Sequence, residues 1–418
     1  MNESRPRVLA ILPAFNPSTQ ICIVKPLMRL YQTKLLKVKI TLEYLVSRKN
    51  LEWADLIIFC RNTESRYAWI LDLIINRNLP FVYDIDDNFF EVPLDSEQGK
   101  YYRHPERLAM HNRYIRSADL VRVYSDPLLE RMKTLNANVE KVFGPIDWDL
   151  ISPPQVHLRQ RPVKLVYATS RFDDDLANLF IPALKRALGR YGEEVEVHFW
   201  GFKPNGLNGR HRVHYHSMVA NYDRFLRRFS REGFDIGLAP LEKDVFHRSK
   251  TNNKFREYGA CGIAGIYSDV DVYSSCVSEG ETGLLVSNET DSWHRAVIRL
   301  IENHDLREKI KRQALEHVRL HYPEKDFERV WWNQIQRVSE KKGKQSAPNT
   351  FLYENNETLL NAKTLPENQS RLLSFVMKTR NVIRKFRRKE SKATFALLKW
   401  RLNDYWMAFK IHFRTLGH

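Results

Sequence analysis

The chain contains 418 residues, of which 43% are hydrophobic, 12% aromatic and 28% charged, and it carries a net charge of +17. This composition is typical of a globular protein with more than one apolar core, and it excludes collagen-like and low-complexity chains. The four cysteines, at positions 22, 60, 261 and 276, have neither the spacing of a zinc knuckle nor the density of a disulfide framework, which favours reduced thiols in the cytoplasm.

Short apolar runs alternate with helical patterns along the first 147 residues. The run that ends at Pro13 is too short for a secretion signal, and no later run is long enough for a membrane-spanning segment. Buried strands are predicted at residues 8–13, 55–60, 81–85, 120–125 and 139–144, with a helix over 67–76. Buried strands separated by helices indicate a parallel sheet that is covered on both faces.

The same alternation restarts after a proline-marked interdomain linker, residues 148–162. Further strands are predicted at 164–170, 196–201, 212–217, 235–241, 264–269 and 283–287, followed by amphipathic helices. We therefore predict an α/β protein with two Rossmann-like domains, residues 1–147 and 163–340. The domains are expected to face a cleft at the carboxyl ends of their strands. The polar, proline-containing residues 341–369 predict a second linker.

Most of the positive charge lies in the C-terminal tail. Residues 370–418 hold 13 Lys and Arg against two acids, a net charge of +11, whereas the first 369 residues carry +6. Apolar side chains recur every three or four residues from Phe395 to Phe413, after a basic run at 384–389. This pattern predicts a basic amphipathic helix that binds an anionic membrane surface. A helix packed on the body is the alternative, and nucleic acid is not expected because no binding motif accompanies the charge.

Common fingerprints of α/β enzymes are absent from the chain. The loop after the first strand, residues 14–18, lacks the GxGxxG of dinucleotide-binding proteins, and no GxxxxGK[ST] is present. The GxSxG and HExxH motifs are also missing. These absences exclude the most frequent interpretations of such a fold.

The most informative segment runs from residue 234 to residue 286. A strand is expected to end at Pro240. A helix is then expected to begin at Asn252 or Asn253, which are both good N-cap residues, and to stop at Gly262. The segment therefore predicts a strand, a polar loop and a helix whose N-terminus follows the carboxyl end of the strand.

The N-terminus of this predicted helix has the properties of an anion site. It offers backbone N–H groups without helical partners, and Lys250 and Lys254 lie beside it in the sequence. A diphosphate suits such a site. Glu257, about one turn into the helix, is predicted to accept hydrogen bonds from vicinal hydroxyl groups such as those of ribose.

Several segments resemble the GT-B glycosyltransferases of the retaining group 1 family, most closely its bacterial surface-polysaccharide subgroup. The specific part is KTNNKFREY at 250–258, GIAGIYSDV at 262–270 and GETGLLV at 280–286, which resembles the donor-binding half. YATSRFDDDL at 167–176 and FVYDIDDNFFEVP at 81–93 resemble further elements of the subgroup. The likeness spans residues 6–340, so it leaves the second linker and the tail outside.

The resemblance implies roles for donor-binding residues. The second Glu of the family's Glu-x7-Glu motif, which binds the nucleotide ribose, corresponds to Glu257, whereas the first Glu falls on Ser249. The basic residue that holds the diphosphate corresponds to Arg171, with Ser170 beside it. The implied donor-binding set is completed by Lys250, Thr251, Asn252 and Lys254.

On the acceptor side, the family's histidine corresponds best to Asp86, which together with Arg171 and Lys250 forms the implied catalytic set. Asp84 and Asp87 are implied acceptor-side residues. These three aspartates also resemble the metal-binding DxD motif of GT-A enzymes, but a polar loop facing the cleft is favoured in a two-sheet protein.

Three histidines have a loosely metal-like spacing, at His211, His214 and His216. His214 and His216 share one face of a predicted strand, which favours an exposed strand over a zinc site.

The sequence thus predicts a glycosyltransferase that moves a sugar from a nucleotide-sugar to a glycan or lipid-linked acceptor, in cell-surface polysaccharide synthesis. Catalysis is expected to be electrostatic, with no metal and no cofactor, at the inner face of the cytoplasmic membrane. Retention of the anomeric configuration is implied by the resemblance alone. A sugar-nucleotide epimerase of the same architecture and a non-catalytic membrane-docking scaffold remain as alternatives.

Overall fold

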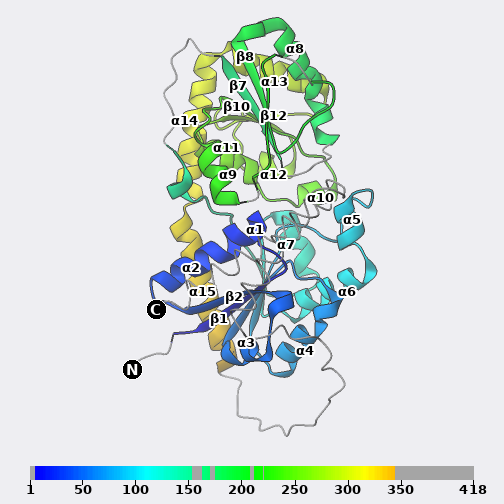
Figure 1. Cartoon of the computed structure of the whole chain (residues 1–418), viewed down its shortest axis with the longest axis vertical. Helices are drawn as coiled ribbons and strands as arrows, with labels where there is room; N and C mark the ends of the chain where they lie inside the picture. Colours follow the sequence, from blue (N-terminus) through cyan, green and yellow to red (C-terminus); the bar gives the residue numbers. More distant parts are fainter. Residues whose placement is uncertain (1–4, 153–161, 170–174, 208–210, 220, 344–418) are drawn as a thin grey trace, which may run out of the picture.

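A computed structural model describes residues 5–152, 162–169, 175–207, 211–219 and 221–343. The chain forms two domains stacked along its long axis, with the N-terminal half below and the second half above in Figure 1. The predicted site residues Ser170 and Arg171, the linker beyond residue 343 and the tail 370–418 lie outside the described residues.

The first domain is built on a parallel six-stranded sheet with the strand order β2-β1-β3-β4-β5-β6. The strands are β1 (Arg7–Leu12), β2 (Lys37–Leu42), β3 (Leu56–Cys60), β4 (Phe81–Asp84), β5 (Leu120–Val123) and β6 (Val139–Lys141). All of them were predicted except β2. In β2 lysines alternate with apolar residues, because this edge strand is only half covered. It therefore lacks the continuous apolar run that marks its neighbours.

Two apolar clusters cover the two faces of the first sheet. One face packs against α2 (Lys25–Gln32), which continues α1 (Pro17–Thr19) through a π-helical turn. The other face packs against several helices. These are α3 (Arg48–Trp53), α4 (Ala68–Asn76), α6 (Pro105–Ser117) and α7 (Asp126–Lys133), with α5 (Glu97–Tyr102) beside α6. The predicted parallel sheet with both faces buried is confirmed.

The second domain repeats this plan with the strand order β12-β11-β10-β7-β8-β9, again all parallel. The strands are β7 (Val163–Ala168), β8 (Val195–Trp200), β9 (Val213–His216), β10 (Ile236–Ala239), β11 (Ala264–Ser268) and β12 (Leu284–Val286). The helices are α8 (Ile181–Tyr191), α9 (Tyr222–Phe229), α10 (Val245–Arg248), α11 (Asn253–Ala260), α12 (Asp271–Ser274), α13 (Thr290–Glu302) and α14 (His304–His321). Every strand of this sheet was predicted.

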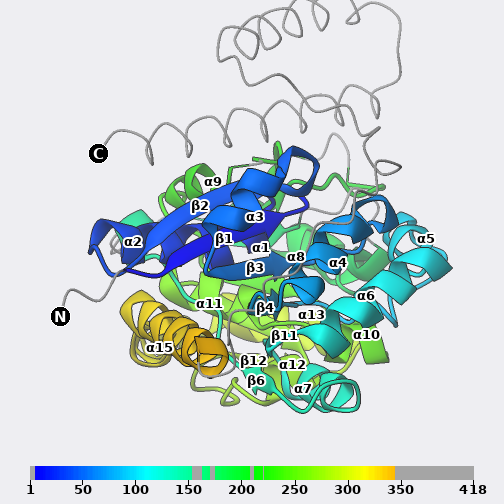
Figure 2. The ribbon, with the colours of Figure 1, turned by 90° about the horizontal axis from the view of Figure 1, so that it is seen from below.

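The last described helix, α15 (Glu324–Gly343), returns to the first domain. Although it lies within the residues assigned to the second domain from the sequence, its apolar side packs in the first core beside α2 and β1. The Trp331 indole is fully buried there, and its Nε1 donates a hydrogen bond to the Cys22 carbonyl at 2.8 Å. Figure 2 shows α15 on the side of the sheet opposite α3 and α4.

Strand order identifies where a ligand is expected to bind. In an open parallel sheet, ligands bind beyond the carboxyl ends of the two strands at which the order reverses direction. These strands are β1 and β3 in the first sheet, and β7 and β10 in the second. Within the described part of the chain, no helix has the length and hydropathy needed to cross a bilayer.

Candidate donor and acceptor site

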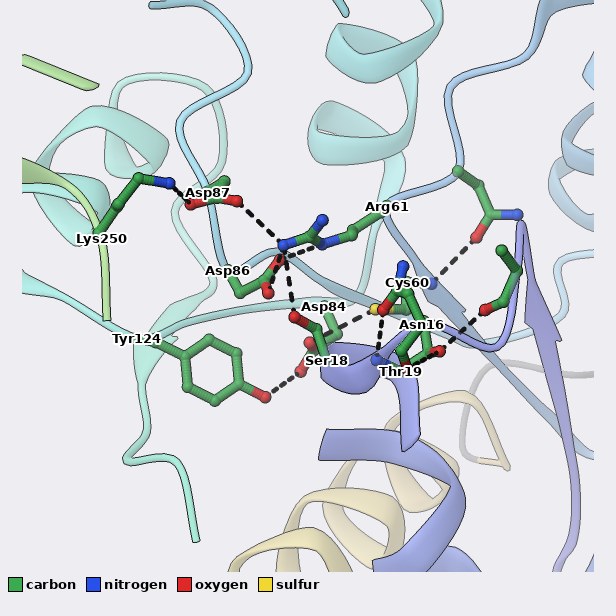
Figure 3. A network of polar contacts seen from close by, with 12 residues as sticks. Asn16, Ser18, Thr19, Cys60, Arg61, Asp84, Asp86, Asp87, Tyr124 and Lys250 are labelled. Atoms are coloured by element: carbon green, nitrogen blue, oxygen red, sulfur yellow. Dashed lines mark hydrogen bonds and ion pairs between the residues drawn. The ribbon is translucent and has the colours of Figure 1, made fainter. Parts of the chain in front are cut away.

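A chain of ion pairs connects the two domains beyond the carboxyl ends of their strands. From the second domain, the Lys250 ammonium lies 3.0 Å from Asp87 Oδ1. Asp87 Oδ2 in turn lies 3.0 Å from Arg61 Nη2, and Arg61 binds both carboxylate oxygens of Asp86. Figure 3 shows this sequence of contacts from Lys250 to Asp86. The structure therefore brings together three of the residues predicted for opposite sides of the site.

Arg61 is the residue of this network that the sequence did not indicate. It follows β3 directly and has a left-handed backbone, with φ of 60°. Its guanidinium is largely buried over the Phe89 ring, 5.5 Å from the centroid. Burial lowers the pKa of Arg61, but the carboxylates of Asp86 and Asp87 outweigh burial and hold the pKa well above its usual value. Its place after a strand at which the order of the first sheet reverses is the topological signal for a ligand-binding residue.

Asp84 has a different environment from its two neighbours. Its side chain is 1% exposed, and its Oδ2 accepts a hydrogen bond from the Tyr124 hydroxyl at 2.8 Å and lies 3.1 Å from Arg122 Nη1. Burial raises the pKa of the Asp84 carboxyl to about 6, although Arg122 and Tyr124 both oppose the rise. Asp84 was predicted as an acceptor-side residue, and the structure places its side chain in the predicted acceptor domain, buried among these contacts.

Ser249 occupies the position where the family resemblance implies the first Glu. Its side chain is buried, and its Oγ donates to the Val245 carbonyl at 2.7 Å. The first domain contacts it twice, because Asn88 Nδ2 donates to its Oγ at 3.4 Å and Ser125 Oγ donates to its carbonyl at 2.7 Å. The small side chain of serine at this position allows the two domains to approach closely.

The start of α11 is organised by a buried arginine rather than by an N-cap side chain. Asn252 occupies the N-cap position, where the helix was predicted to begin, but its side chain makes no cap hydrogen bond. Its Oδ1 accepts from Arg256 Nε at 3.0 Å, and Arg256 also binds Thr251 Oγ1 at 3.0 Å and Asn253 Oδ1. Arg256 further donates to the Pro145 carbonyl at 3.2 Å. The predicted donor-binding side chains of Thr251 and Asn252 therefore hold the loop in place through Arg256.

The remaining two predicted donor residues pair with each other one turn apart. Lys254 Nζ lies 2.8 Å from Glu257 Oε2. Glu257 is 7% exposed, whereas the Lys254 side chain is 26% exposed. A lysine and a carboxylate within the first two turns of a helix provide one group for a phosphate and one for a hydroxyl pair.

The comparisons with known proteins agree with this architecture. Residues 175–326 match the model of a glycosyl transferase-like family, a range that includes Lys250 and Glu257. Sucrose-phosphate synthase from Thermosynechococcus elongatus is similar in structure, with a TM-score of 0.58 at 13% identity over 81% of this chain and all of that one. HepE from Anabaena, in complex with UDP and glucose, gives 0.56 at 13% identity over 78% of this chain and 99% of its own.

The fold is GT-B. The predicted pair of Rossmann-like domains and the resemblance to GT-B glycosyltransferases are thus confirmed, whereas the surface-polysaccharide subgroup stays a prediction. A proposed UDP-N-acetylglucosamine 2-epimerase from Listeria monocytogenes shares the GT-B architecture, with a TM-score of 0.51 at 12% identity over 84% of this chain and all of that one. A sequence comparison with curated proteins finds no match.

Proposed function

We propose that this protein is a glycosyltransferase that takes its sugar from a nucleotide-sugar bound at the start of α11. The observation that carries the proposal is the glycosyl transferase-like match over residues 175–326, because it includes the cationic and acidic groups that a diphosphate and a ribose require. The Anabaena HepE structures contain UDP-glucose or UDP with glucose, which makes UDP-glucose the first donor to test.

Lys250 is proposed to be the main group acting on the diphosphate. Its ammonium is 17% exposed and faces Asp87 across the domain junction, with the Phe246 ring 4.0 Å away. A diphosphate, which gains negative charge as it leaves the sugar, competes with Asp87 for this ammonium. Arg171 is proposed to assist, together with Ser170, as the family resemblance implies.

The acceptor is proposed to bind the first domain beside Asp86 and Asp87. Arg61 already pairs with both carboxylates, so the three side chains form a preorganised polar surface for a glycan or lipid-linked hydroxyl. Cell-surface polysaccharide synthesis and retention of configuration rest on the family resemblance.

The test is incubation of the full chain with a panel of sugar nucleotides in the absence of acceptor. Slow release of the nucleoside diphosphate from one donor supports a transferase, because water then replaces the acceptor. Release of an epimer supports the alternative of a sugar-nucleotide epimerase, which the similarity to the Listeria protein keeps open. If the chain neither binds a nucleotide nor changes any of the sugar nucleotides, the alternative of a non-catalytic membrane-docking scaffold is favoured.

Glu257→Gln is expected to weaken nucleotide binding. The substitution removes a charged acceptor for ribose hydroxyls, which typically contributes about 1.5–3 kcal/mol, or roughly 10- to 150-fold in Kd. Calorimetric titration with UDP measures the effect, and Glu242→Gln, on the exposed loop after β10, is the matched control. Equal affinity of the Glu257→Gln and wild-type proteins, with the fold intact, would exclude Glu257 from the nucleotide site.

Metal-independent transfer is proposed because cations of the protein already face the carboxylates of Asp86 and Asp87. Addition of Mg²⁺ or Mn²⁺ is therefore expected to leave the initial rate of transfer unchanged. A rate that rises and saturates with either metal would instead support the DxD interpretation of these aspartates.

The tail is proposed to hold the enzyme on the inner face of the cytoplasmic membrane, near a lipid-linked acceptor. Its net charge of +11 supports this, because each basic residue near an anionic surface contributes about 1 kcal/mol. Truncation after Gly343 is expected to abolish sedimentation with anionic vesicles while UDP binding is unchanged. Binding of the full chain should weaken as salt rises. If the full chain does not sediment with anionic vesicles at low salt, the tail does not bind membranes.

A further inference from the structure

The edge strand β9 of the second domain and its neighbour β8 carry imidazole and carboxylate groups that the proposed transfer does not use. Their parallel register pairs His198 with His214 and Trp200 with His216, so each pair lies on the same face of the sheet. Glu196, two residues before His198, lies on that face too. One possible ligand atom from each of Glu196, His198 and His214 lies within 4.8 Å of the others.

His198 is the central residue of this cluster. It is 6% exposed, and among the described residues its Nε2 has no hydrogen-bond partner, although Glu196 Oε2 lies 3.4 Å away. Its Nδ1 lies 3.0 Å from His216 Nε2. Burial, reinforced by the neighbouring His214 and His216, lowers the pKa of His198 and so favours the neutral ring. A neutral imidazole with a buried, unpartnered nitrogen has the form in which histidine binds metals.

Neighbouring side chains contact the atoms of Glu196 and His198 that do not face the cluster. Arg212 Nη1 binds Glu196 Oε1 at 2.7 Å, while Oε2 is the oxygen near His198. The contact between His216 and His198 Nδ1 fixes the orientation of the His198 ring. Hydrogen bonds from a second set of residues to the ligand side chains are a regular property of metal sites.

We propose that Glu196, His198 and His214 bind one divalent metal ion, for which Zn²⁺ is the best match. Two imidazoles and one carboxylate form a usual zinc ligand set, with a fourth position left for water. Tetrahedral zinc places its ligand atoms about 3.4 Å apart. The exposed His214 ring can close the remaining distance by rotating about its side-chain bonds.

The metal is expected to stabilise the sheet rather than to take part in transfer. The cluster lies along β8 and β9 themselves, whereas Lys250 and Glu257 follow the carboxyl end of β10. Strand β9 is the edge of the sheet, and a metal bound to both His198 and His214 fastens it to β8.

The test is a titration of the metal-free full chain with Zn²⁺, followed by a competing chromophoric chelator, together with the visible spectrum of bound Co²⁺. We expect one saturable site. His214→Gln should weaken it by roughly 100-fold or more, since loss of even a supporting residue costs 10- to 100-fold. His211→Gln is the matched control, because His211 is also exposed but binds Glu193 outside the cluster. Zn²⁺ should raise the Tm of the wild-type and His211→Gln proteins, but not that of His214→Gln.

His214 is exposed, so His214→Gln is expected to fold normally. Absence of saturable binding in the wild type would overturn the proposal, and the cluster would then be a stack of histidine rings without a metal. Binding that His214→Gln leaves unchanged would overturn it as well, because the metal would lie elsewhere, for example at His317 and His321 on α14.

Discussion

Lys250→Ala is expected to lower kcat for sugar transfer by about 10²- to 10³-fold, which is the usual effect of removing one group that stabilises developing negative charge. The ammonium is held at the domain junction by Asp87, 3.0 Å away, in a largely buried environment where charge interactions are strong. The KM for the nucleotide-sugar should change much less, because the ground-state diphosphate is also bound by the start of α11. Steady-state kinetics at several donor concentrations separate the two constants.

Lys243→Ala is the matched control for this experiment, since Lys243 is an exposed lysine in the loop after β10. It should leave both constants close to those of the wild type. A Lys250→Ala variant with a raised KM and an unchanged kcat would show that Lys250 binds the substrate and the transition state equally. The role proposed for its ammonium would then be wrong.

Arg122→Met is expected to lower the free energy of unfolding by about 3–5 kcal/mol, because it leaves the carboxylate of Asp84 buried without its cation. Arg122 is fully buried, and its Nη1 lies 3.1 Å from Asp84 Oδ2 without the alignment of a hydrogen bond. The guanidinium also stacks on the Trp331 indole of α15, 3.4 Å from the ring centroid. The substitution therefore also weakens the attachment of α15 to the first sheet. Urea denaturation followed by tryptophan fluorescence measures the loss.

Arg113→Met is the control here, because Arg113 forms an exposed ion pair with Asp72 on the same domain. Exposed pairs contribute about 0–1 kcal/mol, so this variant should unfold near the wild-type midpoint. Adding Asp84→Asn to Arg122→Met should restore part of the lost stability, since no charge is then buried alone. If the double variant is as unstable as the sum of the single ones, the two residues are not coupled.

The sequence predicted those parts of the fold that depend on local patterns of apolar residues. Buried parallel strands such as β3 and β11 are continuous apolar runs, and these runs depend only on neighbouring residues. Strand β2 was missed because two lysines and a threonine alternate with its apolar residues, so it contains no continuous apolar run. The packing of α15 in the first domain could not be predicted either, since the partner of Trp331 lies more than 300 residues earlier in the chain.

Only part of the site was predicted, because local patterns reveal some of its residues whereas others depend on contacts between distant parts of the chain. The sequence placed Lys250, Lys254 and Glu257 at the start of a helix, and the structure has them there. The connection from Lys250 through Asp87 to Arg61 joins residues from three separate loops, so no spacing in the sequence reveals it. The roles of Arg256 and Ser249 were missed because both depend on contacts with the other domain or its linker.

The position of α15 has a consequence for how the protein is made. The core of the first domain includes Phe327, Trp331, Ile335 and Val338, so the ribosome must translate nearly all of the described chain before that core can be completed. The second sheet ends with β12 at Val286, and α13 and α14 follow it directly. Domains usually fold in the order of their synthesis. In this protein we expect the first domain to complete its fold after the second. Until α15 has been translated, one face of the first sheet remains partly uncovered, although the second domain can already fold.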